Sequence, residues 1–296
     1  MIELVVEQRD RDISIKVGRV LPSARRRMVG PFIFFDHMGP VDLPKGLPRE
    51  ADVRPHPHIG LATVTYLFVG EVMHRDSTGV EQAIRPGEMN WMTAGSGITH
   101  SERFEQARRQ GGPLHGIQSW VALPNGLEEI APSFAHHTGR DLPFHRDGGA
   151  ELRLLAGDAY GLRGAVAVHS PLFYAHLTLR AGARMALPSE HTERAAFLVS
   201  GAVEADGRAL APNRMAVFAP AGGGILQATA PSVLMLLGGS PVGQRFIEWN
   251  FVSSTKARIE QAKADWSAGR MKLPDHDNRE FIPLPGDPTR AAEPMS

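Results

Sequence analysis

The sequence contains no cysteine. This absence excludes disulfide bonds, thiolate catalysis and cysteine-based zinc sites. No apolar run approaches the ~20 residues that a membrane-spanning helix needs. The opening residues, MIELVVEQRDRD, carry charges that a signal peptide would lack. We therefore expect a cytoplasmic protein that does not enter a membrane.

A surplus of charge is also missing, because Lys+Arg and Asp+Glu both total 32. Neutralising a phosphate backbone requires an excess of basic groups, so we expect no direct binding of nucleic acid. No long exposed apolar stripe is present, and a monomer is the expected state. GxGxxG, P-loop and GxSxG motifs are absent from any strand-to-helix context, which excludes the nucleotide and hydrolase sites that use them.

Glycine (31) and proline (23) are plentiful and separate many short segments rich in valine, isoleucine, threonine, phenylalanine and leucine. Short strands at regular spacing, with turn signals between them, predict an all-β sandwich or barrel fold. Such segments lie at 61–69, 119–123, 172–179, 195–199 and 232–237. One stretch differs: 254–270 has Ser254 or Thr255 as a candidate N-cap, then strong helix formers, then Gly269. It predicts a short C-terminal helix.

The length of 296 residues suggests two domains, at ~150 residues for each. Residues 135–150 are polar and rich in turn formers, which is typical of a linker. We therefore predict a metal-binding N-terminal domain over 1–135 and a second domain over 136–296 that includes the helix.

The two halves also resemble each other. YLFVGEV at 66–72 matches FLVSGAV at 197–203, and AGSGI at 94–98 matches AGGGI at 221–225. The matches keep the same order, with offsets of 131 and 127 residues, which indicates an internal duplication.

Two short motifs carry the candidate chemistry: Pro55-His56-Pro57-His58 and His100-Ser101-Glu102. In an extended segment, side chains at i and i+2 point the same way, so each pair can face one point. The prolines favour extended backbone but cannot donate to a central ladder, so we expect an edge strand, a bulge or a strand entrance there. The strand-like chain between the motifs is long enough to bring both pairs together inside a small barrel.

Three imidazoles and one carboxylate suit iron, manganese, nickel, copper or zinc, and they come close to the two-histidine, one-carboxylate pattern of non-haem iron oxygenases. A lone histidine is more often a hydrogen-bonded core residue than a ligand, so the prediction depends on both pairs together. We interpret His37, His74 and His115 as ordinary surface or pocket residues, with an orienting role for the ligands as the alternative. The side chains of Trp91 and Trp120 are expected in the core.

The sequence resembles the pirin family of the cupin superfamily. The resemblance lies in GPFIFFDHMGP (30–40), PHPHIGLATVTYLFVGEVMHRDSTG (55–79), PGEMNWMTAGSGITHSE (86–102), LHGIQSWVALP (114–124) and RIEQAKADWSAGR (258–270). It implies two tandem cupin domains, each a jelly-roll β-sandwich. The family's metal ligands fall on His56, His58, His100 and Glu102.

The resemblance also implies a quercetin 2,3-dioxygenase-like activity. Such an enzyme opens a flavonol ring with dioxygen and releases carbon monoxide. The implied cofactor is a divalent metal, iron(II) first, with nickel, manganese, copper, cobalt or zinc as alternatives, and Glu102 is the candidate base for the substrate hydroxyl. The alternative is a non-catalytic, metal-binding regulatory protein that contacts a transcription factor or metabolic enzyme in a redox-dependent way.

The duplication also bears on the second domain. The two offsets place Leu187, Ser189, Gln227 and Thr229 at the positions that correspond to the four ligands. None of these residues is a strong metal ligand. We therefore predict that the C-terminal domain binds no metal.

Overall fold

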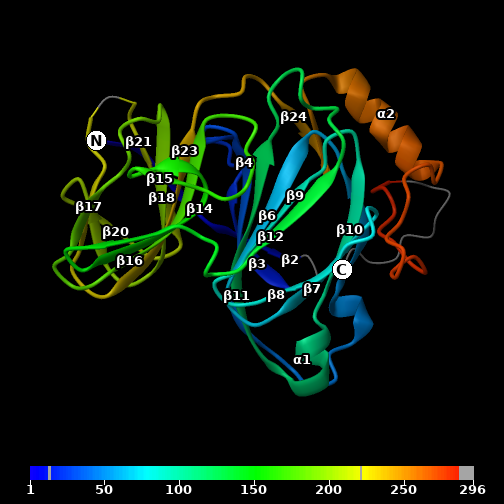
Figure 1. Ribbon diagram of the computed structural model, residues 1–296, viewed down its shortest axis with the longest axis horizontal. Coiled ribbons are helices and arrows are strands. Elements are labelled where there is room, and N and C mark those ends of the chain that lie inside the picture. Colours follow the sequence, from blue (N-terminus) through cyan, green and yellow to red (C-terminus); the bar gives the residue numbers. More distant parts are fainter. Residues whose placement is uncertain (13–14, 221, 287–296) are drawn as a thin grey trace. The chain divides into compact units, whose positions relative to one another are not determined.

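A computed structural model describes residues 1–12, 15–220 and 222–286 of the chain. The described residues form β-strands for the most part, with two α-helices and one short 3-10 helix among them (Figure 1). The predicted all-β class with a short C-terminal helix is confirmed. No helix in the described ranges is long and apolar enough to cross a membrane.

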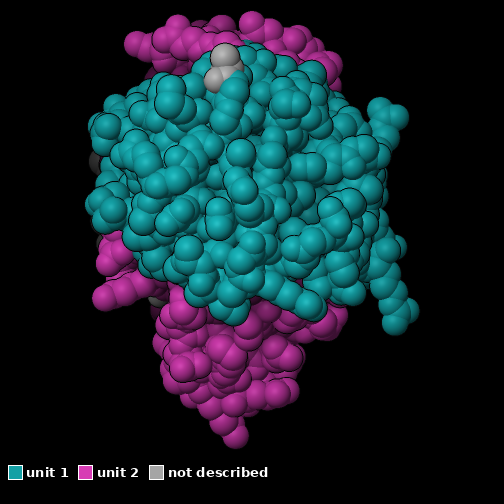
Figure 2. Space-filling model, turned by 90° about the vertical axis from the view of Figure 1, so that its left-hand side faces the viewer, with its two compact units in different colours: residues 1–9, 18–36, 137–242 teal, residues 10–17, 37–136, 243–296 magenta. Residues whose placement is uncertain are grey.

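The chain divides into two compact units, which we call unit 1 and unit 2 (Figure 2). Unit 1 consists of residues 1–9, 18–36 and 137–242, and unit 2 of residues 10–17, 37–136 and 243–296. Each unit contains strands from distant parts of the sequence.

Unit 1 holds a β-sandwich built mainly from the C-terminal half. The larger sheet has the order β1-β21-β18-β23-β16-β14-β13, with β15 paired to β14, and the smaller has the order β17-β22-β19-β20. The core between them contains Leu154, Phe173, Leu198, Phe218 and Leu236. The strands are β1 (Ile2–Glu7), β13 (Phe144–Asp147), β14 (Ala150–Ala159), β15 (Leu162–Arg163), β16 (Leu172–Leu179), β17 (Arg184–Ala186), β18 (Glu193–Ser200), β19 (Val203–Ala205), β20 (Arg208–Leu210), β21 (Arg214–Phe218), β22 (Ile225–Ala228) and β23 (Ser232–Gly239).

Unit 2 holds a four-stranded sheet of order β5-β10-β7-β8 and most of a seven-stranded sheet of order β12-β9-β6-β11-β4-β3-β2. A two-stranded ribbon and both α-helices complete it. The elements are β2 (Arg9–Asp12), β3 (Lys16–Leu21), β4 (Phe32–Leu43), η1 (Arg49–Ala51), β5 (Val53–His58), β6 (Leu61–Val69), β7 (Val72–Asp76), β8 (Glu81–Ile84), β9 (Met89–Thr93), β10 (Ile98–Arg103), α1 (Glu105–Gln110), β11 (Gly112–Ala122), β12 (Ser133–His137), β24 (Phe246–Glu248), β25 (Phe251–Ser253) and α2 (Lys256–Ser267).

The position of β6 inside its sheet explains why its sequence, LATVTYLFV, does not alternate between apolar and polar residues. β6 lies between β9 and β11, and its residues 61–67 are all buried. A strand covered on both faces is apolar along its length, with threonine at the positions that can form hydrogen bonds. Trp91 and Trp120, on the flanking strands, are buried as expected.

The helix α2 begins after Thr255, whose hydroxyl accepts a hydrogen bond of 3.3 Å from the backbone nitrogen of Arg258. It buries Ile259, Ala262 and Trp266, which share one face because they are spaced by three and four residues. These side chains pack in unit 2 against Phe251 and Ile59. Ile59 directly follows His58, the last residue of β5.

The predicted single boundary between residues 135 and 136 differs from the observed units in three respects. Residues 18–36, with the end of β3 and the start of β4, belong to unit 1. The N-terminal strand β1 belongs to unit 1, because it pairs with β21. Residues 243–286, with α2, belong to unit 2, because α2 packs there. The expected linker at 135–150 contains the end of β12, all of β13 and the start of β14, with a turn near Thr138 to Asp141.

Candidate metal centre

The two histidine motifs lie on neighbouring antiparallel strands of unit 2. His100 of β10 pairs directly with His56 of β5, and Ile98 pairs with His58. Side chains at paired and alternate positions project to the same face of a sheet, so the three imidazoles share one face. β5 is an edge strand, which agrees with the two prolines in it.

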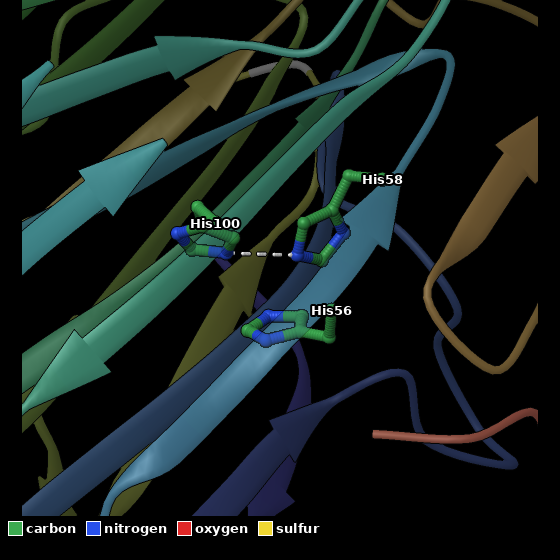
Figure 3. Close-up of side chains that lie close together, drawn as sticks. All are labelled: His56, His58 and His100. Atoms are coloured by element: carbon green, nitrogen blue, oxygen red, sulfur yellow. Dashed lines mark hydrogen bonds between the residues drawn. The ribbon is translucent and has the colours of Figure 1, made fainter. Parts of the chain in front are cut away.

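The three imidazole rings converge on one point (Figure 3). One ring nitrogen from each lies within 4.8 Å of the others, and all three side chains are buried. The Nε2 atoms of His58 and His100 are 3.1 Å apart. Trp120 closes one side, with its ring 5.0 Å from that of His58.

The outer nitrogens of two rings face carbonyl oxygens. His56 Nδ1 lies 2.9 Å from the Arg54 oxygen and His58 Nδ1 lies 3.0 Å from the Asn250 oxygen. A carbonyl only accepts, so each Nδ1 carries the hydrogen and each Nε2 keeps a lone pair for the shared point. Nitrogen ligands at right angles on one ion, ~2.1 Å from it, are ~3 Å apart. The 3.1 Å spacing of His58 and His100 therefore fits two ligands of one ion.

Burial keeps these histidines neutral. Desolvation lowers the pKa of His56 to about 4, against a smaller opposing effect of its hydrogen bond to Arg54. Desolvation and the neighbouring rings also lower the pKa of His58 and of His100 well below the ordinary value. Metal binding requires neutral imidazole, so at neutral pH no proton must leave these three ligands.

Glu102 lies on β10 two residues after His100, so its side chain projects to the same face of the sheet. Between these residues the pairing with β5 shifts register, from His100 opposite His56 to Glu102 opposite Val53. Within the described residues, the donors that lie within 4.8 Å of one another come from the three histidines, and Glu102 is not among them. Its role as fourth ligand remains a prediction.

The Glu102 carboxyl group contacts the side-chain amide of Gln118, which belongs to the seven-stranded sheet. Gln118 Nε2 of β11 donates a hydrogen bond of 3.1 Å to Glu102 Oε1, and Thr65 of β6 donates one of 2.6 Å to Gln118 Oε1. Thr65 thereby turns the amide nitrogen of Gln118 toward the carboxyl group. Burial raises the pKa of Glu102 to about 7, although the hydrogen bond from Gln118 acts in the opposite direction.

The three other histidines of this half differ from one another. His74 and His37 are both buried, so the interpretation of these two as surface residues is wrong. His74 Nδ1 lies 3.4 Å from Nδ1 of His100, a contact that fits the alternative of an orienting role. His37 and His115 contact each other, with Nε2 atoms 2.7 Å apart, and are not in the three-histidine group. The signal that sequence reasoning missed for His74 is its spacing from Asp76, because this i, i+2 pair matches the two ligand motifs.

The pairing of β17 with β22 identifies the counterparts of the ligands in unit 1. Gln227 pairs with Arg184 and Ile225 with Ala186, as His100 pairs with His56 and Ile98 with His58. The predicted counterparts Leu187 and Ser189 are therefore wrong by three residues. The reason is a longer connection, because six residues (187–192) join β17 to β18 where two (59–60) join β5 to β6. Ala221, at the start of the second glycine motif, lies outside the described residues.

Two family models match the chain. The model described as Pirin matches residues 14–121, and the model described as Pirin C-terminal cupin domain matches residues 174–272. A pirin-like protein of Caulobacter vibrioides is 60% identical over 287 residues, which cover 96% of this chain and 100% of that protein.

Two solved structures show the same fold. A quercetin 2,3-dioxygenase of Acinetobacter baumannii has a TM-score of 0.87 and 31% identity, and the match covers 97% of this chain and 96% of that one. The bacterial pirin YhhW of Escherichia coli, solved in complex with nickel(II), has a TM-score of 0.64 at 18% identity. That match covers 81% of this chain and 100% of the other.

Proposed function

This chain belongs to the pirin family, and from that membership and the histidine cluster we propose that it is a metal-dependent dioxygenase that opens a flavonol ring. One observation carries the proposal: His56, His58 and His100 bring three neutral imidazoles to one buried point. A buried cation site in a β-sandwich suits the chemistry of a small molecule. The solved quercetin 2,3-dioxygenase supports the choice of a flavonol.

Iron(II) is the metal that we propose, held by the three histidines and Glu102. Imidazole and carboxylate ligands suit iron and also nickel, cobalt, manganese, copper and zinc. Nickel(II), which YhhW was found to bind, is one of these ions. When bound, the ion supplies Lewis acidity toward the flavonol oxygens and electron exchange with dioxygen. The three histidines contribute no proton to these steps, because burial holds their pKa values low.

Glu102 is the proposed base. It removes the proton of the flavonol 3-hydroxyl as an ionised carboxylate. The pKa of Glu102 in the metal-free protein is about 7, and a bound cation lowers it, so the carboxylate is the form present near neutral pH. Gln118 orients the carboxyl group through the 3.1 Å hydrogen bond. The Trp120 ring beside His58 forms an apolar wall that limits access of water.

The test is turnover. The metal-free protein is loaded anaerobically with iron(II), and in parallel with nickel, cobalt, manganese, copper or zinc, then mixed with quercetin in air. We expect loss of the flavonol absorbance with one carbon monoxide released for each dioxygen consumed. His100→Ala should lose both metal and turnover, because it removes one of the three imidazoles.

The matched control is His191→Gln, a buried histidine of unit 1 whose Nε2 contacts the Asp158 carbonyl. We expect it to keep metal content and turnover. No turnover with any of these ions would contradict the proposed reaction. A stoichiometric protein partner, captured only with one iron oxidation state, would then favour the non-catalytic alternative.

A further inference from the structure

A line of three hydrogen-bonding side chains extends from the metal centre into the four-stranded sheet. In β7 and β10, Asp76 pairs with His100 and His74 pairs with Glu102. These four residues therefore project to one face of the sheet. His74 and Asp76 are 5% and 1% exposed, so their contacts are protected from water.

The contacts continue from ring to ring to carboxylate. His100 Nδ1 lies 3.4 Å from His74 Nδ1, and His74 Nε2 lies 2.9 Å from Asp76 Oδ2. The His74 ring stacks on Phe134, with centroids 4.6 Å apart and planes at 25°. His74 is thus fixed both by stacking and by hydrogen bonds.

The hydrogen bonds of Asp76 fix which of its two carboxylate oxygens faces His74. Its other oxygen, Oδ1, accepts hydrogen bonds from the backbone nitrogen and hydroxyl of Thr78, at 2.8 and 2.6 Å, and from the backbone nitrogen of Val80, at 3.4 Å. Backbone N–H groups only donate, so Oδ1 must remain an acceptor. Oδ2 is left to accept from His74.

We propose that Asp76 and His74 form a relay that sets the tautomer of the ligand His100. Because Asp76 Oδ2 accepts, His74 Nε2 carries a hydrogen, and in the neutral ring His74 Nδ1 is then an acceptor. His100 Nδ1 then donates to it, which leaves a lone pair on His100 Nε2, the nitrogen that faces His58. A hydrogen bond at the outer nitrogen also makes imidazole a stronger ligand. His74 and Asp76 are positioning residues, and the relay depends on the proposed metal centre but not on the proposed reaction.

The relay makes Asp76→Asn a sharper test than removal of His74. With Oδ1 kept on Thr78 and Val80, the new amide nitrogen faces His74 Nε2 and donates to it. His74 must then carry its hydrogen on Nδ1 and donate to His100, whose hydrogen moves to Nε2 and blocks the metal-facing lone pair. An Asp→Asn change that imposes the wrong histidine tautomer has a large functional cost in other sites.

His74→Phe removes the relay without imposing a tautomer, and it retains an aromatic ring beside Phe134. We expect it to weaken zinc(II) binding ~10-fold, the lower end for loss of such an outer partner. Asp76→Asn should weaken it ~100-fold or more, the upper end of the same range. In the double variant, the Asp76→Asn change should add little to the effect of His74→Phe, because its path to His100 is gone.

The experiment measures zinc(II) affinity by competition with a chromogenic chelator, and histidine tautomers by long-range ¹⁵N–¹H correlation spectra. Wild type should show hydrogen on Nδ1 of His100, and Asp76→Asn should show it on Nε2. Asp206→Asn is the matched control, because Asp206 also accepts backbone hydrogen bonds, from Gly224 and Ile225, but lies in unit 1.

Two results would overturn the relay. One is wild-type affinity with an unchanged His100 tautomer in Asp76→Asn. The other is an Asp76→Asn loss of the same size with and without His74, which would mean that Asp76 acts only through the fold. Absent flavonol turnover, together with the expected ranking of affinities, would overturn the proposed reaction and leave the relay supported.

Discussion

Arg103 donates hydrogen bonds of 2.7 Å from Nε and Nη2 to the two carboxylate oxygens of Asp277, 174 residues further along the chain. Ser101 donates a third, also of 2.7 Å. Ser101 and Arg103 alternate with His100 and Glu102 along β10, so they lie on the opposite face of the sheet. The segment that follows α2 is therefore tied to the back of the strand that carries two predicted ligands.

We expect Asp277→Ala to lower the free energy of unfolding by about 3 kcal/mol. Arg103 is 1% exposed, and a buried charge that loses its partner costs ~3–5 kcal/mol. The lower end applies because Arg103 keeps contacts with Glu280, at 3.0 Å, and Asp52, at 3.4 Å. Denaturant unfolding of the metal-free protein measures the change.

Asp275→Ala provides the comparison two residues earlier. Asp275 forms an ion pair of 2.8 Å with Lys272, and both side chains are about half exposed. Exposed pairs contribute only ~0–1 kcal/mol, so this variant should be almost as stable as wild type. An equal decrease in the free energy of unfolding in the two variants would show that the buried pair with Arg103 stabilises the protein no more than the exposed pair does.

Local pattern was enough to predict the histidine cluster. The two ligand motifs each have a spacing of two residues, His56 with His58 and His100 with Glu102. Both motifs lie in segments with the pattern of a β-strand, so the shared orientation of each pair follows from the two-residue period of a strand. The C-terminal helix was predictable for the same reason, since its cap residue Thr255 and Gly269 are local signals.

Pairing between distant strands could not be predicted from such patterns. The contact of His74 with His100 depends on the register of β7 against β10, which no single segment encodes. The Arg103–Asp277 pair likewise gives no local signal. The apolar face of α2 indicated burial but not which unit would cover it. This is one reason why the predicted division of the chain differs from the observed one, and the pairing of β1 with β21 is another.

The number of protons released on metal binding should depend on pH. With a pKa of about 7, Glu102 is mostly protonated at pH 6 and mostly ionised at pH 8, whereas the low pKa values of the three histidines keep them neutral at both. If Glu102 is a ligand, binding of zinc(II) should release about one proton at pH 6 and about a tenth of a proton at pH 8. Calorimetry in buffers of different ionisation enthalpy gives this count.

Glu102→Gln is the decisive variant for that measurement. It cannot release the proton, so the count should fall close to zero at both pH values. An unchanged count at pH 6 would mean that the proton comes from another group and that Glu102 is not the fourth ligand.

The same carboxyl group should make the metal-free protein less stable as the pH rises. Native Glu102 keeps its proton up to a pKa of about 7, whereas in the unfolded chain the pKa is near 4.5. Between these values the native state holds more protons, so the free energy of unfolding falls, by up to about 3 kcal/mol in total. Glu102→Gln removes this loss while His56, His58 and His100 titrate as before.

Urea unfolding of the two metal-free proteins at pH 4.5 and pH 8 checks this expectation. The stability of Glu102→Gln relative to wild type should rise between the two pH values by up to about 3 kcal/mol. A difference that stays constant with pH would show that the carboxyl group titrates as it does in the unfolded chain.

The amide of Gln118 should control the pH at which Glu102 ionises. Its donation to Glu102 Oε1 favours the ionised form, so Gln118→Leu leaves desolvation unopposed and should raise the pKa of Glu102. A hydrogen bond to a charged group contributes ~1.5 kcal/mol, and the midpoint of the proton-release curve should therefore move up by about one pH unit. The curve is obtained by calorimetric proton counting from pH 5.5 to pH 9.

Thr65→Val tests the same contact one step away. It removes the hydroxyl that donates to Gln118 Oε1 at 2.6 Å, so the amide is less firmly oriented and the midpoint should move up by less than in Gln118→Leu. Thr178→Val, which removes a hydroxyl in contact with the Glu151 carbonyl of unit 1, should leave the midpoint unchanged. A midpoint that stays in place or moves down in Gln118→Leu would rule out stabilisation of the carboxylate by the amide.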